Sequence, residues 1–317
     1  MAETGNTQRE KAAAYGPILV GVGAALWGTE TLWRVFLNRQ FPSDVLVFYE
    51  HIYCLFFALP VLWIFRAKLH NIPARAWWFL LGSGVIGSAV GTFFFTASLK
   101  TVNLTVANVL LNIQPLFSAV YARFLLNERF GKGFFAWGVV AIIAGVFLSL
   151  DHLSLQGINL SGDLWMVFIT ALCWSFATVA GRGANTGMSY LVASPLRFAI
   201  GLIAMAAIVA INGHFNAESM HMVAFALPRT HQDFLFLSIA AGVIPLFLYF
   251  KGLSLTPAST ASFFEMFQIV AALLVTWGFF HQTLAIHQSI AAGVLIIAAY
   301  FINIIQGRVN ATGALSE

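Results

Sequence analysis

Ionisable side chains inside long apolar runs are the residues of this sequence that could do chemistry. Glu265 lies about eight residues into an apolar run, and Gln268 follows at i+3 on the same helical face. A charge at the centre of a membrane helix costs about 2.5–3.5 kcal/mol, which disfavours an unpaired charge facing lipid. We interpret Glu265 as a ligand for an amine or as a proton-binding carboxylate. The structural alternative is a buried carboxyl group hydrogen-bonded to a neighbour.

A second apolar run holds Glu50 and His51 side by side. A desolvated carboxyl group is a candidate proton carrier, and His51 could assist it. The alternative is that Glu50 pairs with another helix as a structural clamp. In a third run Arg197 could bind a carboxylate with its planar guanidinium, or it could be the partner of a membrane glutamate.

Glu30 and Arg34 stand four residues apart, so they can pair along one helical face. The simplest interpretation is a self-compensating pair near the outer interface, where the long Arg34 side chain can reach polar surroundings. Glu30 also remains a candidate for substrate binding.

Polar and aromatic residues form a second group of candidates. Asn108 and Asn112 share a helical face and could bind a ligand or form interhelical hydrogen bonds, which contribute only about 0.6 kcal/mol on average. Trp27 and Trp174 could wall a cavity or pack in a core. Gly84, Gly87 and Gly91 lie on one face and predict close helix packing.

The composition places these residues in a membrane protein. The chain has 317 residues, of which 60% are hydrophobic and only 9% charged, whereas a soluble domain carries about 25% charged residues. The net charge of +4 comes without a basic stripe, so nucleic acid is not an expected partner. Cys54 and Cys173 lie inside apolar runs, and no metal cluster, phosphate loop or catalytic triad is visible. We expect no cofactor and no enzymatic activity, with a small-molecule substrate and membrane lipid as partners, in a monomer or homodimer.

Apolar runs predict ten transmembrane helices and no strands, because backbone groups in hydrocarbon must be satisfied within each segment. The predicted segments are 17–37, 44–65, 77–96, 104–126, 133–150, 161–180, 190–212, 233–250, 257–280 and 287–306.

The two halves of the chain resemble each other. An offset of 147 superposes Trp27 on Trp174, and an offset of 154 superposes Gln114 on Gln268, which predicts an insertion of seven residues at 213–232. We expect one repeat at 1–156 and a second at 157–317. Five helices per repeat is an odd number, so the second repeat enters the membrane from the opposite side.

Basic residues orient the chain. With a cytoplasmic N-terminus, ten Lys and Arg residues fall on the inside and four on the outside, as the positive-inside rule requires. Both termini are therefore expected to face the cytoplasm.

The stretch from Ala97 to Glu128, with its central Pro115 and terminal Asn127-Glu128, and the Ala25-Leu26-Trp27-Gly28 sequence resemble the drug/metabolite transporter superfamily. The resemblance is to bacterial transporters with two EamA-type repeats and covers essentially the whole chain. The second copy, from Gly252 to Gln282, departs from the pattern at Ile269 and at His281-Gln282, and Glu50 stands where members often have arginine.

This resemblance implies transport as the class of function, and no particular substrate. We expect the protein to carry a small polar metabolite across a bacterial inner membrane. The buried charges suit an amino acid, an amino-acid derivative or an organic cation, carried by alternating access, with proton coupling as an option. A membrane channel and an intramembrane enzyme are the alternatives. The expected substrate-binding residues are Glu265, Glu50, Glu30, Arg197, Asn108, Asn112, Gln268, Trp27, Trp174 and His51.

Overall fold

A computed structural model describes residues 2–102, 104–150, 163–224, 226–280 and 285–313, and every regular element in these ranges is a helix. Eight helices are long and apolar enough to cross a membrane, and Tyr15–Trp27 and Phe134–Ser149 are shorter apolar helices. The prediction of ten membrane helices is confirmed. The expected repeat boundary at 156/157 and the His281-Gln282 pair lie outside the described residues.

The first five crossings run from the N-terminus to residue 149. Their elements are α1 (Ala2–Trp27), α2 (Thr31–Gln40), α3 (Ser43–Ile64), η1 (Arg66–Leu69), α4 (Ala74–Gly82), η2 (Ser83–Gly91), α5 (Thr92–Ser98), α6 (Leu104–Leu111), α7 (Gln114–Leu125) and α8 (Phe134–Ser149). η1 is a 3₁₀ turn, and η2 is a π-helical stretch inside the third crossing.

The second five crossings follow the same plan. Their elements are α9 (Leu164–Asn185), α10 (Tyr190–Ile211), α11 (Ala217–Ala224), α12 (Pro228–Ser238), η3 (Ile239–Val243), α13 (Ile244–Leu255), α14 (Ala258–Glu265), α15 (Phe267–Phe280) and α16 (Ile286–Gly313). The π-helical stretch η3 lies inside the eighth crossing, as η2 lies inside the third.

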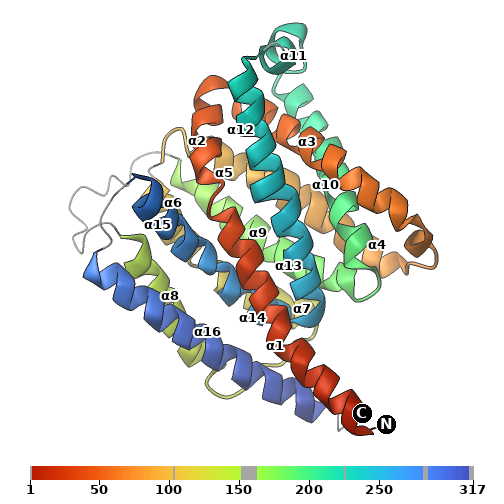
Figure 1. Cartoon of the computed structure of the whole chain (residues 1–317), viewed down its shortest axis with the longest axis vertical. Helices are drawn as coiled ribbons and strands as arrows, with labels where there is room; N and C mark the ends of the chain where they lie inside the picture. The colour runs from red at the N-terminus through yellow and green to blue at the C-terminus, as the bar shows by residue number, and fades with distance from the viewer. Residues whose placement is uncertain (1, 103, 151–162, 225, 281–284, 314–317) are drawn as a thin grey trace.

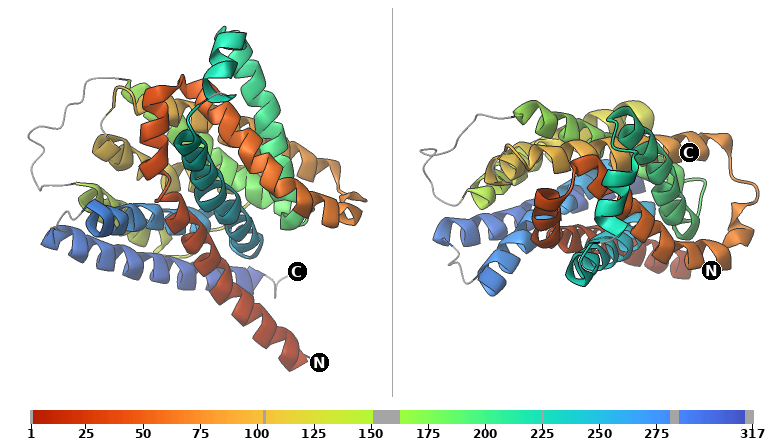
Figure 2. Two further views of the ribbon diagram at one scale, coloured as in Figure 1. Left: turned by 45° about the horizontal axis from the view of Figure 1, so that its top comes forward. Right: turned by 90° about the horizontal axis from the view of Figure 1, so that it is seen from above.

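The helix bounds follow the two sequence offsets. α10 begins and ends 147 residues after α3, and α14 begins and ends 154 residues after α6. The added short helix α11 lies in the predicted insertion at 213–232. The fold therefore consists of two five-helix repeats of inverted topology, and the first turns of α1 lie at the same end of the molecule as the last turns of α16 (Figures 1 and 2).

Three crossings that were predicted as continuous helices are broken near their middles. The first is interrupted between α1 and α2, where the Glu30 N–H donates to the Trp27 carbonyl in a tight turn. The fourth breaks before Pro115, whose nitrogen cannot donate to the preceding turn. The ninth breaks at Met266 without any proline, and the Met266 N–H donates to Phe263 three residues back. The fourth and ninth breaks lie at equivalent places of the two repeats, whereas α9, the counterpart of the first crossing, is continuous. Discontinuous helices are typical of transport sites.

Helix packing separates a central bundle from an outlying pair. α1 packs along α13, and α8 packs mainly against α16 at one side of the molecule (Figure 1). Inside the bundle the predicted close packing of glycines is confirmed: a Cβ at Gly87 would overlap Ala177, and one at Gly91 would lie 2.8 Å from the Trp174 ring.

Glu128 joins the two halves at the end that holds the helix termini of α7 and α14. Its carboxylate accepts hydrogen bonds from the backbone N–H of Ala258 at 2.7 Å and of Ser259 at 3.2 Å, and from the Ser259 hydroxyl at 2.5 Å. These are unpaired amides of the first turn of α14, so a negative charge here also meets the positive end of the helix dipole. The acidic residue that ends the first motif thus caps a helix of the second repeat.

Candidate substrate-binding site

A central cavity of about 140 Å³ lies between the repeats and is lined by eight of the ten crossings. Among the described residues, α8 and α16 contribute no side chain to its wall. The breaks of the first, fourth and ninth crossings and both π-helical stretches border it, which is a common position for such irregularities. The cavity wall contains all ten residues expected from the sequence: Glu265, Glu50, Glu30, Arg197, Asn108, Asn112, Gln268, Trp27, Trp174 and His51.

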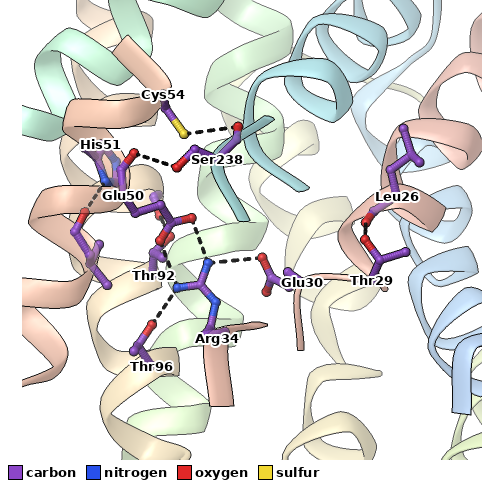
Figure 3. Close-up of polar contacts among 12 residues, drawn as sticks. Leu26, Thr29, Glu30, Arg34, Glu50, His51, Cys54, Thr92, Thr96 and Ser238 are labelled. Atoms are coloured by element: carbon purple, nitrogen blue, oxygen red, sulfur yellow. Dashed lines mark hydrogen bonds and ion pairs between the residues drawn. The ribbon is translucent and has the colours of Figure 1, made fainter. Parts of the chain in front are cut away.

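Arg34 is the centre of a charged cluster on the wall formed by the first repeat (Figure 3). Its Nη1 and Nη2 donate to the two carboxylate oxygens of Glu50 at 2.9 and 2.8 Å. Nη2 also donates to Glu30 at 3.1 Å, and Nη1 donates to the Thr96 hydroxyl at 3.0 Å. A bidentate guanidinium–carboxylate pair is among the stronger polar contacts in proteins.

This cluster changes the interpretation of two residues. The expected Glu30–Arg34 pair is present. Arg34 is only 1% exposed, so the expectation that its side chain reaches polar surroundings at the membrane interface is wrong. The reason is the stronger attraction of a second carboxylate on the neighbouring helix. Glu50 has both oxygens bound to Arg34, which matches the alternative of a structural clamp.

Glu265, in the second repeat, ends α14 and borders the same cavity. One oxygen, Oε1, accepts hydrogen bonds from the Thr178 hydroxyl at 2.8 Å and the Tyr249 hydroxyl at 2.7 Å. The two hydroxyls also lie 2.9 Å from each other. Within the described part of the chain Glu265 forms no ion pair, so its partners are neutral donors that orient the carboxylate without cancelling its charge.

Arg197 lies on α10 and borders the same cavity. Its guanidinium carbon stands 5.5 Å from the centre of the Phe250 ring, a cation–π distance. Its buried Nε has no hydrogen-bond partner, and the described residues supply no carboxylate within ion-pair distance. The guanidinium therefore remains available for an anionic group in the cavity.

His51 is held by its own helix and by η2. Its Nδ1 donates to the Val47 carbonyl at 2.8 Å, and its Nε2 lies 3.0 Å from the Ser88 hydroxyl. A carbonyl can only accept, so Nδ1 carries a proton, and Nε2 can accept from Ser88 in the neutral ring. The imidazole is 3% exposed and shapes the wall next to Glu50.

The two asparagines play different parts. The side chain of Asn112 points toward α8, where its Nδ2 donates to the Ser149 hydroxyl at 3.1 Å. The same Nδ2 also donates to the Asn108 carbonyl of α6 at 2.9 Å. This geometry secures the break between α6 and α7. Asn108 and Gln268 border the cavity on the fourth and ninth crossings.

Two aromatic pairs next to the cavity are equivalent in the two repeats. The rings of Trp27 and Tyr249 are 4.8 Å apart at 51°, and those of Trp174 and Phe95 are 4.9 Å apart at 50°. The offsets of 147 and 154 relate one pair to the other. Each pair joins a first-repeat residue to a second-repeat residue, so the inverted symmetry extends to side-chain packing.

The sequence did not reveal the contribution of three residues to the site, namely Tyr249, Thr178 and Arg34. Tyr249 is not among the residues expected at the site, yet its hydroxyl donates a hydrogen bond to Glu265. The i+4 spacing of Thr178 from Trp174 could have placed Thr178 on the cavity wall. The Arg34–Glu50 pair left no sequence pattern, since the two residues lie on different helices.

Comparisons with known proteins agree with this architecture. The sequence profile of the EamA-like transporter family matches residues 14–150 and 160–304, one match in each half. A solved crystal structure superposes with a TM-score of 0.70 over 92% of this chain and 98% of its own length, at 17% identity, which shows a shared fold.

Three curated relatives match at low identity. Riboflavin transporter ImpX of Fusobacterium nucleatum is 27% identical over 63% of this chain and 70% of its own. Inner membrane protein YtfF of Escherichia coli is 23% identical over 38% of this chain, and the match spans 40% of that protein. The chloroplastic WAT1-related protein At3g02690 of Arabidopsis thaliana is 25% identical over 74% of this chain and 56% of its own length.

The two profile matches cover most of the chain, and both helix repeats contribute to a cavity that holds charged side chains. The chain belongs to the EamA-like transporter family of the drug/metabolite transporter superfamily and is a multi-pass membrane transporter, not an enzyme.

Proposed function

We propose that this protein is a secondary transporter of a small zwitterionic metabolite, an amino acid or an amino-acid derivative, across a bacterial inner membrane. Arg197 would bind the carboxylate of the substrate and Glu265 would bind its amine. The observation that carries the proposal is that these two side chains of opposite charge border one cavity and that neither is ion-paired with a described residue.

The chemistry of the two groups supports this assignment. A guanidinium presents a planar pair of donors that matches a carboxylate, and a carboxylate held by two hydroxyls keeps acceptor capacity for an ammonium. The two charges attract each other across the cavity but form no direct ion pair, so a ligand that places a counter-charge in contact with each of them is favoured.

The size of the cavity supports a substrate of amino-acid dimensions. Its volume of about 140 Å³ is below the roughly 300–1,000 Å³ that is typical of sites for drug-sized ligands. The riboflavin named for the relative from Fusobacterium is larger and carries no group that would require both an arginine and a glutamate. It nevertheless belongs in any substrate panel, because Trp27 and Trp174 give the cavity aromatic walls.

The inverted repeats support alternating access, in which the two halves rock about the site. The excess of basic residues on one side, together with the common end of α1 and α16, supports cytoplasmic termini. Proton coupling through Glu265 is part of the proposal, since its carboxylate can exchange a proton for a substrate amine. Glu50, bound on both oxygens by Arg34, is a weaker candidate for this exchange.

Counterflow in proteoliposomes tests the proposal. A panel of radiolabelled amino acids, organic cations and riboflavin would be offered to the wild type, Arg197→Gln and Glu265→Gln. We expect saturable counterflow of an amino acid and its loss in Arg197→Gln. Glu265→Gln should weaken counterflow, because the amine loses its partner, and should remove the dependence of the remaining transport on a pH gradient. Arg39→Gln and Glu218→Gln, both at exposed positions, are the matched controls. Conduction without saturation would indicate a channel, and counterflow of riboflavin alone would refute the zwitterion assignment.

A further inference from the structure

The formal charges of the ionisable side chains on the cavity wall do not sum to zero. The wall contains three carboxylates, Glu30, Glu50 and Glu265, and two guanidiniums, Arg34 and Arg197. With all of them ionised the cavity carries one excess negative charge, because a neutral His51 adds none. A zwitterion bound at Arg197 and Glu265 leaves this excess unchanged.

The excess is located on the wall of the first repeat. The two terminal nitrogens of Arg34 donate four hydrogen bonds. Two of these go to Glu50, so both carboxylate oxygens of Glu50 accept from Arg34. Glu30 shares only one of these nitrogens, through Oε2 at 3.1 Å. Among the described residues it accepts no other side-chain hydrogen bond, so its second oxygen, Oε1, keeps its full acceptor capacity. Figure 3 shows Glu30 at the margin of the cluster, with Arg34 between it and Thr96.

The backbone places Glu30 where a ligand can reach it. It lies in the break between α1 and α2, three residues after Trp27, and it borders the cavity while only 8% exposed. Breaks of this kind bring ligand-binding groups to the middle of a membrane protein. A carboxylate so buried, with part of its charge uncompensated, favours a cation at hydrogen-bond distance.

We infer that Glu30 forms a second cation subsite and that the preferred substrate carries an extra positive group, as a basic amino acid does. This rests on the proposed function, which supplies the sites for the substrate's carboxylate and α-amine. The side-chain ammonium of lysine or ornithine would meet Glu30 on the first-repeat wall, while the α-carboxylate meets Arg197 on the second. Substrate and cavity then neutralise each other, and one molecule bridges both repeats.

Lysine and norleucine test this assignment, because norleucine keeps the four-carbon side chain without the ammonium. Counterflow rates and ligand-induced thermal stabilisation would be measured for both. In the wild type we expect lysine to exceed norleucine in kcat/KM by about tenfold or more. Glu30→Gln should lower the lysine value by about tenfold and leave norleucine within about twofold, and Glu30→Asp should restore part of the preference. Glu30→Gln keeps the Arg34–Glu50 pair, so the fold is preserved, which its melting temperature checks.

The outcomes separate this inference from the function on which it rests. Equal effects of Glu30→Gln on lysine and norleucine, or none on either, would overturn the cation subsite. If norleucine and lysine are both carried and both lost in Arg197→Gln, the zwitterion site stands whatever Glu30 does. If neither is carried nor stabilises the protein, and no other amino acid does so, both proposals fall.

Discussion

Arg34 and Glu50 form a bidentate ion pair between α2 and α3, with nitrogen–oxygen distances of 2.9 and 2.8 Å. Glu30 joins the same guanidinium, so one cation serves two buried carboxylates. Removing Arg34 would therefore leave two carboxylates without a cation, whereas removing the charge of Glu50 would leave one ion pair in place.

Arg34→Gln should destabilise the protein more than Glu50→Gln. The first change leaves two carboxylates buried together without a cation, at an expected cost of about 3–5 kcal/mol. The second leaves Arg34 paired with Glu30, and the loss should be about 1–3 kcal/mol. Unfolding by denaturant in detergent micelles would measure both, with Arg39→Gln at an exposed position as the control. Equal losses would contradict the shared-cation interpretation.

Gly87→Ala should destabilise the contact between η2 and α9, and Ala177→Gly should rescue it. The added methyl group would overlap the Cβ of Ala177, and overpacking of this kind costs about 1–3 kcal/mol. Removing the opposing methyl group in the double variant restores the space. Thermal melting of the two single variants and the double variant gives the coupling, and Gly293→Ala, with open space around it, is the control. An unrescued double variant would show that the glycine is needed for another reason.

Tyr249→Phe should weaken transport and also lower stability, because it removes a buried hydrogen bond. The change removes the hydroxyl that lies 2.7 Å from Glu265 and keeps the ring that packs on Trp27. Losing one hydrogen bond to a charged group amounts to about 1.5–3 kcal/mol, so KM for the transported amino acid should rise about tenfold or more. Initial rates in proteoliposomes and the melting temperature would be compared with Tyr300→Phe, whose ring is exposed. A normal KM in Tyr249→Phe would mean that the hydroxyl does not orient the site.

Glu128→Ala should loosen the attachment of α14 to the end of α7. The carboxylate satisfies the amides of Ala258 and Ser259, and the loss of a helix cap costs about 0.5–2 kcal/mol. Hydrogen exchange at these two amides should accelerate before exchange in the middle of the bundle does. Glu218→Ala, at an exposed position, provides the comparison. Unchanged exchange at Ala258 would argue against the cap.

Much of the fold could be predicted because the bilayer imposes one length and one composition on every crossing. The ten segments and the seven-residue insertion followed from apolar runs and from two constant offsets. Inside the crossings the sequence was less informative. Pro115 gave a reason for the fourth break, but Met266 breaks the ninth crossing without a proline, and no residue type marks the π-helical stretches.

The cavity residues were predictable for a different reason. Charges such as Glu265 and Arg197 are too costly to face lipid, so depth alone directs them inward. Their partners were not predictable, because pairing depends on which helices touch. The sequence made Glu50 a candidate proton carrier, but Arg34 occupies both of its carboxylate oxygens.

The π-helical stretches η2 and η3 have a consequence for anyone who draws helical wheels for this chain. A wide turn holds an extra residue, and each residue of an ordinary helix advances the direction of the side chain by about 100°. The residues of α5 therefore point elsewhere than the pattern of α4 would suggest. Thr96, which contacts Arg34, and Phe95, which packs on Trp174, both follow this wide turn, and Tyr249, which contacts Glu265, follows the matching turn in the other half. A deletion of one residue within η2 would re-aim the far half of that crossing while leaving its composition and hydropathy almost unchanged.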